Sequence, residues 1–245
     1  MTGASSEARG TRRREPPWWD HQRHPLVALR RTVDRVLQER IARGHGQRVF
    51  DLGCGDRPYE PLIRSRGYAY VGCDLDGGAD LVMTPGRRLD AADGAAAGVV
   101  SFQVLEHVWD LDWYLGECRR LLEPGGWLLL STHGVWPYHP HPTDFRRWTR
   151  DGLRAELESR GLEIVAFRGL LGPLAWTTQI RALGFRHVLL AIPVVRLITP
   201  LVIWLMNVRI AVEEMVTPDA IREENASIYV ALCRRRESDR GEHDR

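Results

Sequence analysis

The sequence is poor in cysteine and places no two cysteines close together. Its four cysteines, Cys54, Cys73, Cys118 and Cys233, contain no Cys-x-x-Cys pair. This spacing argues against a disulfide framework and against a cysteine-based zinc site, and it suits a protein of a reducing cytosol. We therefore expect the four thiols to serve in packing.

The sequence also lacks a marked excess of charge of either sign. Its 34 Lys and Arg residues nearly balance its 32 Asp and Glu residues, which gives a formal net charge of +2. The basic residues are spread along the chain without interleaved aromatic residues, whereas a nucleic-acid groove gathers them on one face. We therefore expect no nucleic-acid partner.

An apolar core of the kind found in a secretory signal is missing near the N-terminus. Residues 1–20 are polar and contain the triplet Arg12 to Arg14, but the segment 15–20 that follows is the wrong context for a twin-arginine signal. The sequence predicts a cytoplasmic protein. It also predicts a disordered polar tail over 1–24 and a second polar tail over 236–245.

Between the tails, buried strand patterns alternate with amphipathic helix patterns. Helical spacing of apolar residues occurs over 25–43, 58–66, 111–122 and 149–160, and strand patterns occur over 48–52, 68–73, 80–83, 98–103, 127–132, 162–167 and 227–233. Strands that alternate with helices predict an α/β fold with a mostly parallel sheet. We expect one catalytic domain formed by 25–169 and 217–235.

A glycine turn follows the first predicted strand, where ligands bind in parallel sheets. Gly53 and Gly55 allow a sharp turn and a close backbone approach, and Asp51 directly precedes them. Asp74, at the end of the second strand, can accept hydrogen bonds from a ribose diol. A dinucleotide-binding turn would need a third glycine where this chain has Pro58, so NAD and FAD are disfavoured.

Four motifs together resemble the class I S-adenosylmethionine-dependent methyltransferases of the type-11 group. In order along the chain they are Val49-Phe50-Asp51-Leu52-Gly53-Cys54-Gly55, Val71-Gly72-Cys73-Asp74, Gln103-Val104-Leu105-Glu106-His107-Val108 and Leu122-Glu123-Pro124-Gly125-Gly126. The resemblance covers about 47–169. It implies a Rossmann-like, doubly wound sheet of seven strands in the order 3-2-1-4-5-7-6, with the last strand antiparallel.

The resemblance also implies S-adenosylmethionine as the cofactor and suggests which residues hold it. Asp51, Gly53 and Gly55 would lie at the methionine part, Asp74 at the ribose hydroxyls and Gln103 near the sulfonium. We add the neighbours Cys54 and Leu75 as cofactor contacts. An acidic residue usually lies near the adenine, and Asp90 or Asp93 is the candidate here.

Glu106 and His107 follow the fourth strand at the rim where a methyl acceptor would lie. Some ubiquinone-pathway O-methyltransferases with a similar Glu-x-x-Glu-His motif bind a divalent metal there, but this chain has Gln103 in place of the first glutamate. A neutral amide weakens a site for a hard cation. We therefore expect no metal, and assign Glu106 and His107 either to acceptor binding or to orienting the following loop.

A polar patch follows the fifth strand and should overhang the cofactor. A histidine there could take a proton from a hydroxyl acceptor, and an aspartate could orient it. The candidates are His133, His139, His141 and Asp144 for catalysis, and Trp136, Tyr138 and Arg147 for acceptor binding. Three prolines make the loop rigid, so Asp144 and Arg147 could equally form a salt bridge that closes it.

An apolar insertion occupies 170–216, before the last strand. Its segment 188–208 is long enough to cross a bilayer, but it contains Arg196 and is broken by Pro193 and Pro200. A single span would leave the last strand on the wrong side of the membrane. We expect a helical lid, a hairpin dipping into one leaflet or a homodimer contact through 183–212.

The sequence thus predicts methyl transfer to a small-molecule or lipid-like acceptor, with a hydroxyl as the favoured group. Transfer from a sulfonium is an in-line displacement that depends on alignment and desolvation, so the absence of a catalytic triad does not count against an enzyme. The alternatives are a non-catalytic partner subunit with the cofactor fold and, less favoured, a NAD-dependent oxidoreductase.

Overall fold

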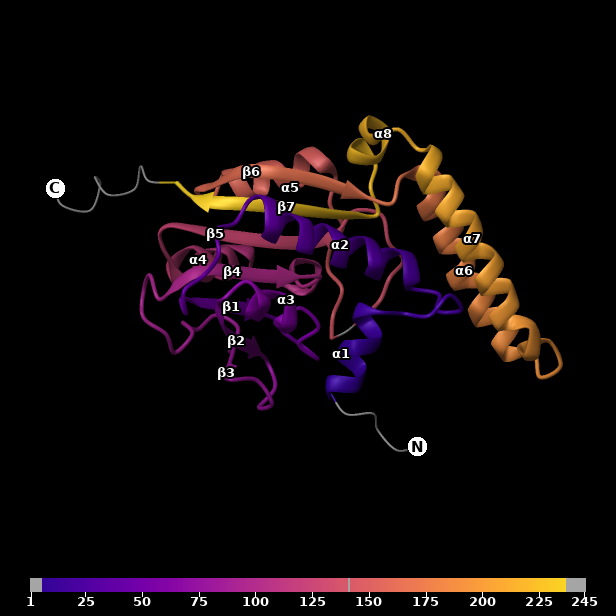
Figure 1. Ribbon diagram of the computed structural model, residues 1–245, viewed down its shortest axis with the longest axis horizontal. Helices are drawn as coiled ribbons and strands as arrows, with labels where there is room; N and C mark the ends of the chain where they lie inside the picture. The colour runs from indigo at the N-terminus through magenta and orange to yellow at the C-terminus, as the bar shows by residue number, and fades with distance from the viewer. Residues whose placement is uncertain (1–5, 141, 237–245) are drawn as a thin grey trace.

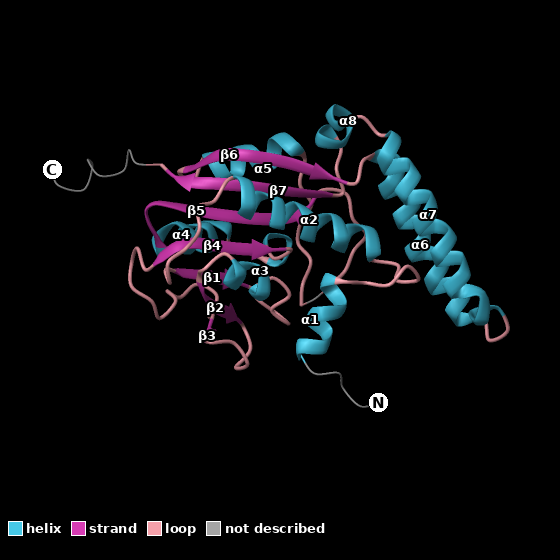
Figure 2. Cartoon of the chain, in the orientation of Figure 1, coloured by secondary structure: helices cyan, strands magenta, loops and turns pink. Residues whose placement is uncertain are grey.

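The computed structural model describes residues 6–140 and 142–236, and its centre is a seven-stranded sheet (Figures 1 and 2). The strand order is β3-β2-β1-β4-β5-β7-β6, and β7 runs antiparallel to both of its neighbours. This confirms the predicted fold class and strand order. The strands are β1 (Arg48–Leu52), β2 (Ala69–Asp74), β3 (Leu81–Val82), β4 (Ala96–Phe102), β5 (Leu122–His133), β6 (Leu162–Leu170) and β7 (Ile228–Arg235).

Helices cover both faces of the sheet and enclose two apolar clusters. One cluster joins the sheet to α4 (Leu111–Leu121) and α5 (Arg150–Glu158), and the other joins it to α2 (Arg23–Glu39) and α3 (Glu60–Ser65). Every residue of β4 is buried, because a central parallel strand has helices on both sides. The four cysteines are buried and free, in agreement with a packing role.

The parallel strands β1, β2, β4 and β5 all end at the same edge of the sheet. Their carboxyl ends bring the glycine turn, Asp74, Gln103 and His133 to that edge. A short 3-10 helix, η1 (Leu105–His107), follows β4 there. This edge is where the ligand site of a doubly wound sheet is expected.

The N-terminal segment differs from the expected disordered tail over its described residues. Helix α1 (Ser6–Arg14) lies beside the glycine turn, where Arg9 Nε is 2.8 Å from Asp56 Oδ1. Gly10 permits the close approach, because a Cβ at that position would lie 2.6 Å from the Asp56 carbonyl oxygen. The contacts that hold α1 in place are polar, so the apolar periodicity that reveals other helices is absent from its sequence.

The insertion forms a helical hairpin that extends beyond the carboxyl edge of the sheet (Figure 1). Its elements are α6 (Pro173–Ala191), the 3-10 helix η2 (Val195–Ile198) and α7 (Thr199–Val216), and a short helix α8 (Asp219–Glu224) leads into β7. The prolines at 193 and 200 coincide with the turn of the hairpin and the start of α7, where a missing N–H is tolerated.

Candidate active site

The glycine turn after β1 is held against the end of β2 by backbone hydrogen bonds. Gly53 N–H and Cys54 N–H both donate to the Cys73 carbonyl, at 2.8 and 3.0 Å. Gly53 has a φ of +82°, and a Cβ there would lie 2.5 Å from a methyl carbon of Val104. Over Gly55, by contrast, a Cβ would meet only Arg13 Nη1, at 4.0 Å. The backbone of Gly55 is therefore open to a ligand, with a guanidinium from α1 close by.

Asp74 ties this turn to the end of β2. Its carboxylate accepts hydrogen bonds from Gly55 N–H and from Leu75 N–H, both at 2.7 Å. The side chain is only partly buried. An ionised carboxylate has about four lone-pair sites, so two remain for a diol.

Asp51 is placed behind the turn rather than at its surface. It is 2% exposed, and the Tyr70 hydroxyl donates a hydrogen bond of 2.7 Å to its Oδ2. Burial raises the pKa of Asp51 to about 7, because the charged form loses its hydration. Asp51 therefore supports the glycine turn from the protein interior.

Sequence reasoning missed a second acidic anchor, Asp80. Its carboxylate accepts from Gly72 N–H at 2.7 Å and pairs with both terminal nitrogens of Arg57, at 2.9 and 3.1 Å. This pair joins the turn after β1 to the loop after β2. The positive φ of +52° at Arg57, a non-glycine residue, accompanies the contact. In the sequence, Arg57 and Asp80 are recognisable only as residues of opposite charge. Their pairing across 23 residues depends on the fold.

Gln103 lies at the carboxyl end of β4 in an unusual backbone conformation. Its φ is +58°, and its Nε2 donates to the Ser131 hydroxyl at 2.9 Å. The amide oxygen Oε1 is buried and has no hydrogen-bond partner among the described residues. Strained backbone and an unused buried acceptor are features that gather at functional sites. The role of Gln103 beside the sulfonium stays a prediction.

The two acidic residues expected near the adenine lie away from this edge. Asp93 precedes β4 and therefore lies at the opposite edge, where its carboxylate is 2.8 Å from Arg120 Nη1 and also pairs with Arg88. Asp90 lies between Leu89 and Ala91, whose carbonyls accept hydrogen bonds from the same Arg120. The structure thus does not bring either residue to the glycine turn. Segment 84–95 runs beside α4 toward the opposite edge of the sheet. The spacing of residues in the sequence does not predict this path.

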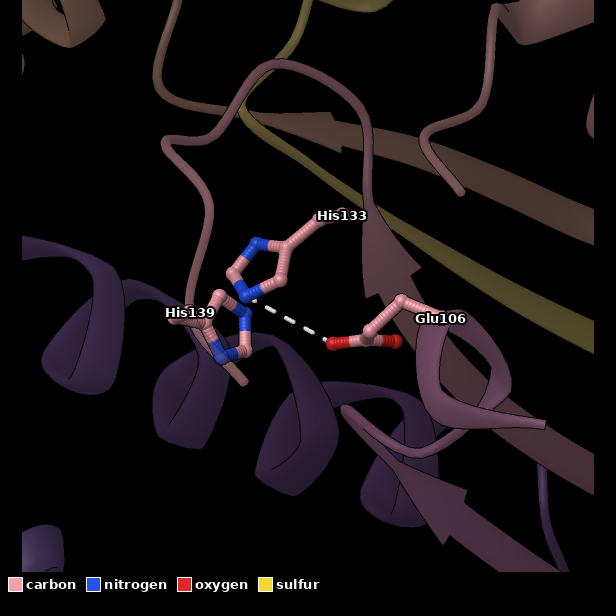
Figure 3. A group of neighbouring side chains, drawn as sticks. All are labelled: Glu106, His133 and His139. Carbon is pink, nitrogen blue, oxygen red and sulfur yellow. Dashed lines mark ion pairs between the residues drawn. The ribbon is translucent and has the colours of Figure 1, made fainter. Parts of the chain in front are cut away.

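Glu106, His133 and His139 converge at the rim beyond Gln103 (Figure 3). Glu106 comes from η1 and His133 from the last residue of β5, and both side chains are buried. Glu106 Oε1 is 3.5 Å from His133 Nε2, and Thr132 Oγ1 donates to Glu106 Oε2 at 2.8 Å. Burial raises the pKa of Glu106 to about 7 and lowers that of His133 well below its ordinary range.

The loop after β5 is fixed by Arg147. Its guanidinium donates to both oxygens of Asp144, at 2.5 and 2.6 Å, and to the carbonyls of Trp136 and Pro137, at 2.9 and 2.8 Å. Asp144 also accepts from His139 N–H at 2.9 Å, and its pKa is lowered to about 2, chiefly by the bond from Arg147. These contacts are those of the loop-closing salt bridge that the sequence left as one alternative.

The other predicted rim residues are distributed around this loop. The Trp136 ring stacks on His133 with centroids 4.9 Å apart, and His107 Nδ1 is 2.5 Å from the Thr143 carbonyl oxygen. Tyr138 is 74% exposed and turned to solvent. His141, the remaining catalytic candidate, lies outside the described residues.

A family model described as a methyltransferase domain matches residues 19–166. The chain belongs to the class I S-adenosylmethionine-dependent methyltransferases. It is 32% identical over 220 residues to a "Ubiquinone biosynthesis O-methyltransferase" of Dinoroseobacter shibae, a match that covers 70% of this chain and 88% of the relative.

It is also 30% identical over 147 residues to a "Probable S-adenosylmethionine-dependent methyltransferase" of Mycolicibacterium smegmatis. That match covers 53% of this chain and 57% of the relative, so the chain spans less than two thirds of it.

Solved methyltransferase structures share the fold at low sequence identity. One is a 1,6-didemethyltoxoflavin-N1-methyltransferase of Burkholderia thailandensis, solved with bound 1,6-didemethyltoxoflavin and S-adenosylhomocysteine. Its TM-score is 0.51 at 16% identity, and the match covers 86% of this chain and 79% of that one. At this identity the likeness shows the fold alone.

Proposed function

We propose that this methyltransferase moves a methyl group from S-adenosylmethionine to a hydroxyl of a small-molecule or lipid-like acceptor. The supporting observation is the pairing of Gly55 with Asp74 at the carboxyl edge of the sheet, in a chain of this family. The open backbone at Gly55 would receive the methionine part, and the free lone pairs of Asp74 would receive the ribose diol. Arg13 would face the cofactor carboxylate.

In this proposal the histidine-lined rim receives the acceptor. Transfer forms a bond from the acceptor oxygen to the methyl carbon while the bond from that carbon to sulfur breaks, and the hydroxyl proton leaves to solvent. The rim excludes water through buried Glu106 and His133 and through the loop fixed by Arg147. A hydroxyl acceptor is also consistent with the O-methyltransferase named among the relatives.

The hairpin supports an apolar or membrane-borne acceptor because two of its polar residues are buried while many of its apolar residues are exposed. Gln179 on α6 and Asn207 on α7 are fully buried. Asn207 Nδ2 donates to the carbonyls of Trp18 and Asp20, at 2.7 and 2.9 Å. On the outside, Val194 is 83% exposed and Leu197 is 78% exposed.

A water-exposed helical hairpin usually directs its apolar residues to the core, so this much exposed apolar surface is unusual for one. Polar residues between helices and apolar residues outside are typical of helices in lipid. Residues Val195–Val216 are long and apolar enough to cross a membrane, a test of length and composition only. We propose that the hairpin rests in the cytoplasmic leaflet and holds the carboxyl edge of the sheet near the acceptor.

Liposome flotation tests the membrane part of the proposal. The variant Leu197→Glu/Leu201→Glu/Leu205→Glu changes exposed residues at the hairpin turn and along α7, and we expect it to lose most binding to vesicles of mixed neutral and anionic phospholipid. The control is Val165→Glu, at an exposed position on β6. Equal flotation of all three proteins, or a stable dimer in detergent-free solution that buries the hairpin, would contradict it.

The transfer reaction is tested by measuring S-adenosylhomocysteine release with phenolic and lipid-linked hydroxyl acceptors. We expect release with at least one acceptor of this class, and none without an acceptor. Tight cofactor binding with no release across hydroxyl, amine and carbon acceptors would instead favour a non-catalytic partner subunit.

A further inference from the structure

The cluster of Glu106, His133 and His139 has the composition and arrangement of a metal site. Each residue offers one ligand atom, and the three atoms lie within 4.8 Å of one another. Figure 3 shows the two imidazole rings and the carboxylate directed toward a common point. The residues come from three separate segments: η1, the end of β5 and the loop after it.

The separation of two of the ligand atoms already suits a tetrahedral ion. With metal–ligand bonds of about 2.0–2.1 Å, neighbouring ligands of a tetrahedral site lie roughly 3.4 Å apart. Glu106 Oε1 and His133 Nε2 are already 3.5 Å apart. His139 has its ring centroid 5.0 Å from that of His133, at an angle of 81°, so the rings converge edge to face and do not stack.

Two buried polar atoms of the cluster, one on Glu106 and one on His133, also lack hydrogen bonds within the described part of the chain. Glu106 is 0% exposed, yet its Oε1 and the buried His133 Nδ1 have no hydrogen-bond partner among the described residues. A buried carboxylate without a compensating partner is costly, and a cation offsets that cost. The other oxygen, Oε2, accepts from Thr132, which leaves Oε1 directed at the cluster.

Neighbouring contacts hold the ligands in place. His139 N–H is bound by Asp144, and Arg147 fixes Asp144 together with the loop carbonyls. The ring of Trp136 stacks on His133 at an interplanar angle of 10°. Such supporting contacts orient metal ligands and tune their affinity.

We propose that Glu106, His133 and His139 bind a divalent transition metal, zinc by preference, and leave a fourth position open for an oxygen ligand. Two imidazoles and one carboxylate match the three protein ligands of catalytic zinc sites, whereas a hard cation such as Mg²⁺ prefers oxygen ligands. The set differs from the motif Gln103-x-x-Glu106-His107, because His107 is turned to the Thr143 carbonyl. The absence of a first glutamate at 103 therefore does not weaken it.

The open position lies at the rim to which we assign the acceptor, and this role rests on the proposed function. A metal-bound hydroxyl releases its proton to solvent more readily, as zinc-bound water does. The resulting oxygen anion would supply the electron pair for the new bond to the methyl carbon, and the pair of the old bond would remain on sulfur. The metal itself undergoes no change of oxidation state.

Metal binding is tested without any enzyme assay. The full-length protein is freed of metal with a chelator and titrated with Zn²⁺ by calorimetry and with Co²⁺ by visible absorption. We expect one Zn²⁺ per chain and the intense visible bands of four-coordinate Co²⁺. His139→Asn and Glu106→Gln should each weaken Zn²⁺ binding by more than about 100-fold, since even outer-shell changes cost 10–100-fold.

The matched control is His107→Gln, a neighbouring histidine outside the cluster, which should retain Zn²⁺ binding. Asp74→Ala should also retain it, which separates failure of the metal site from failure of the cofactor site. No Zn²⁺ binding by the unaltered protein, a weak six-coordinate Co²⁺ spectrum, or loss of binding in His107→Gln but not in His139→Asn would overturn the proposal. The first two outcomes do not depend on how any variant folds.

Discussion

Among single residues, Asp74 is the one on which the proposed binding of S-adenosylmethionine depends most. Replacing it in Asp74→Ala removes the acceptor of the Gly55 and Leu75 N–H groups as well as the ribose contacts. Hydrogen bonds to a charged group contribute about 1.5–3 kcal/mol each, so we expect S-adenosylmethionine affinity to fall at least about tenfold. Calorimetry measures this directly.

The control for this prediction is Asp151→Asn. The side chain of Asp151 is 91% exposed, in the first turn of α5. It should leave the affinity unchanged. Equal binding by Asp74→Ala and the unaltered protein would show that Asp74 does not hold the cofactor.

Asp51 should make the free energy of unfolding depend on pH, because burial raises its pKa from the ordinary 3.8 to about 7. Ionisation therefore favours the unfolded chain. The stabilising contribution of the protonated carboxyl is fully present below about pH 4 and is lost progressively as the pH rises through about 7. Asp51→Asn cannot ionise, so its free energy of unfolding should rise relative to the unaltered protein across that window and level off above it.

Urea denaturation of both proteins at several pH values between 4 and 8 measures this difference. The Tyr70 hydroxyl can still donate to the amide oxygen of the variant, so the packing is little changed. A difference between the two proteins that stays constant with pH would mean that Asp51 is ionised in the fold throughout.

Single residues differ in how well the sequence predicts their positions. Gly55 and Asp74 could be placed from the sequence, because the ends of neighbouring parallel strands meet at one edge. Asp93 could not be placed in this way, because its pairing with Arg120 depends on the path of the loop beside α4. The same holds for Asp80 and Arg57, whose pairing needs the two loops to be side by side.

At the scale of elements, the hairpin depends on Asn207. The side-chain amide of Asn207 joins α7 to the carbonyls of Trp18 and Asp20. The backbone carbonyl oxygen of Asn207 lies 2.7 Å from His24 Nε2. Asn207→Leu leaves the Trp18 carbonyl without this donor and the Asp20 carbonyl with only the Arg23 N–H, and an unsatisfied buried carbonyl costs about 1–3 kcal/mol. We expect faster amide hydrogen exchange in α6, α7 and residues 18–24, with the sheet unchanged.

A matched control is Met206→Leu, one residue earlier on α7 and of similar volume, which should leave exchange unchanged. Exchange in Asn207→Leu that equals the unaltered protein would mean that the hairpin is anchored by other contacts. Neither α1 nor this anchor could be predicted from the sequence, because polar contacts between distant segments leave no periodic pattern.

For the molecule as a whole, the sequence predicts the sheet and its strand order. It does not predict which side of each hairpin helix is buried. Strand patterns and four spaced motifs specify the fold, and the apolar content of 170–216 indicates helices. The buried side of each hairpin helix includes a polar residue, Gln179 on α6 and Asn207 on α7. Polar residues are usually exposed, so the sequence alone would place both on the surface. The inward-facing polar residues emerge only from the assembled structure.

Calorimetric titration of the full-length protein with S-adenosylmethionine tests whether the carboxyl edge around Gly55 and Asp74 binds this cofactor. We expect a single saturable site, with competition by S-adenosylhomocysteine and no heat of binding from NAD. Absence of any S-adenosylmethionine binding by the folded protein, or binding of NAD at the same edge, would contradict it.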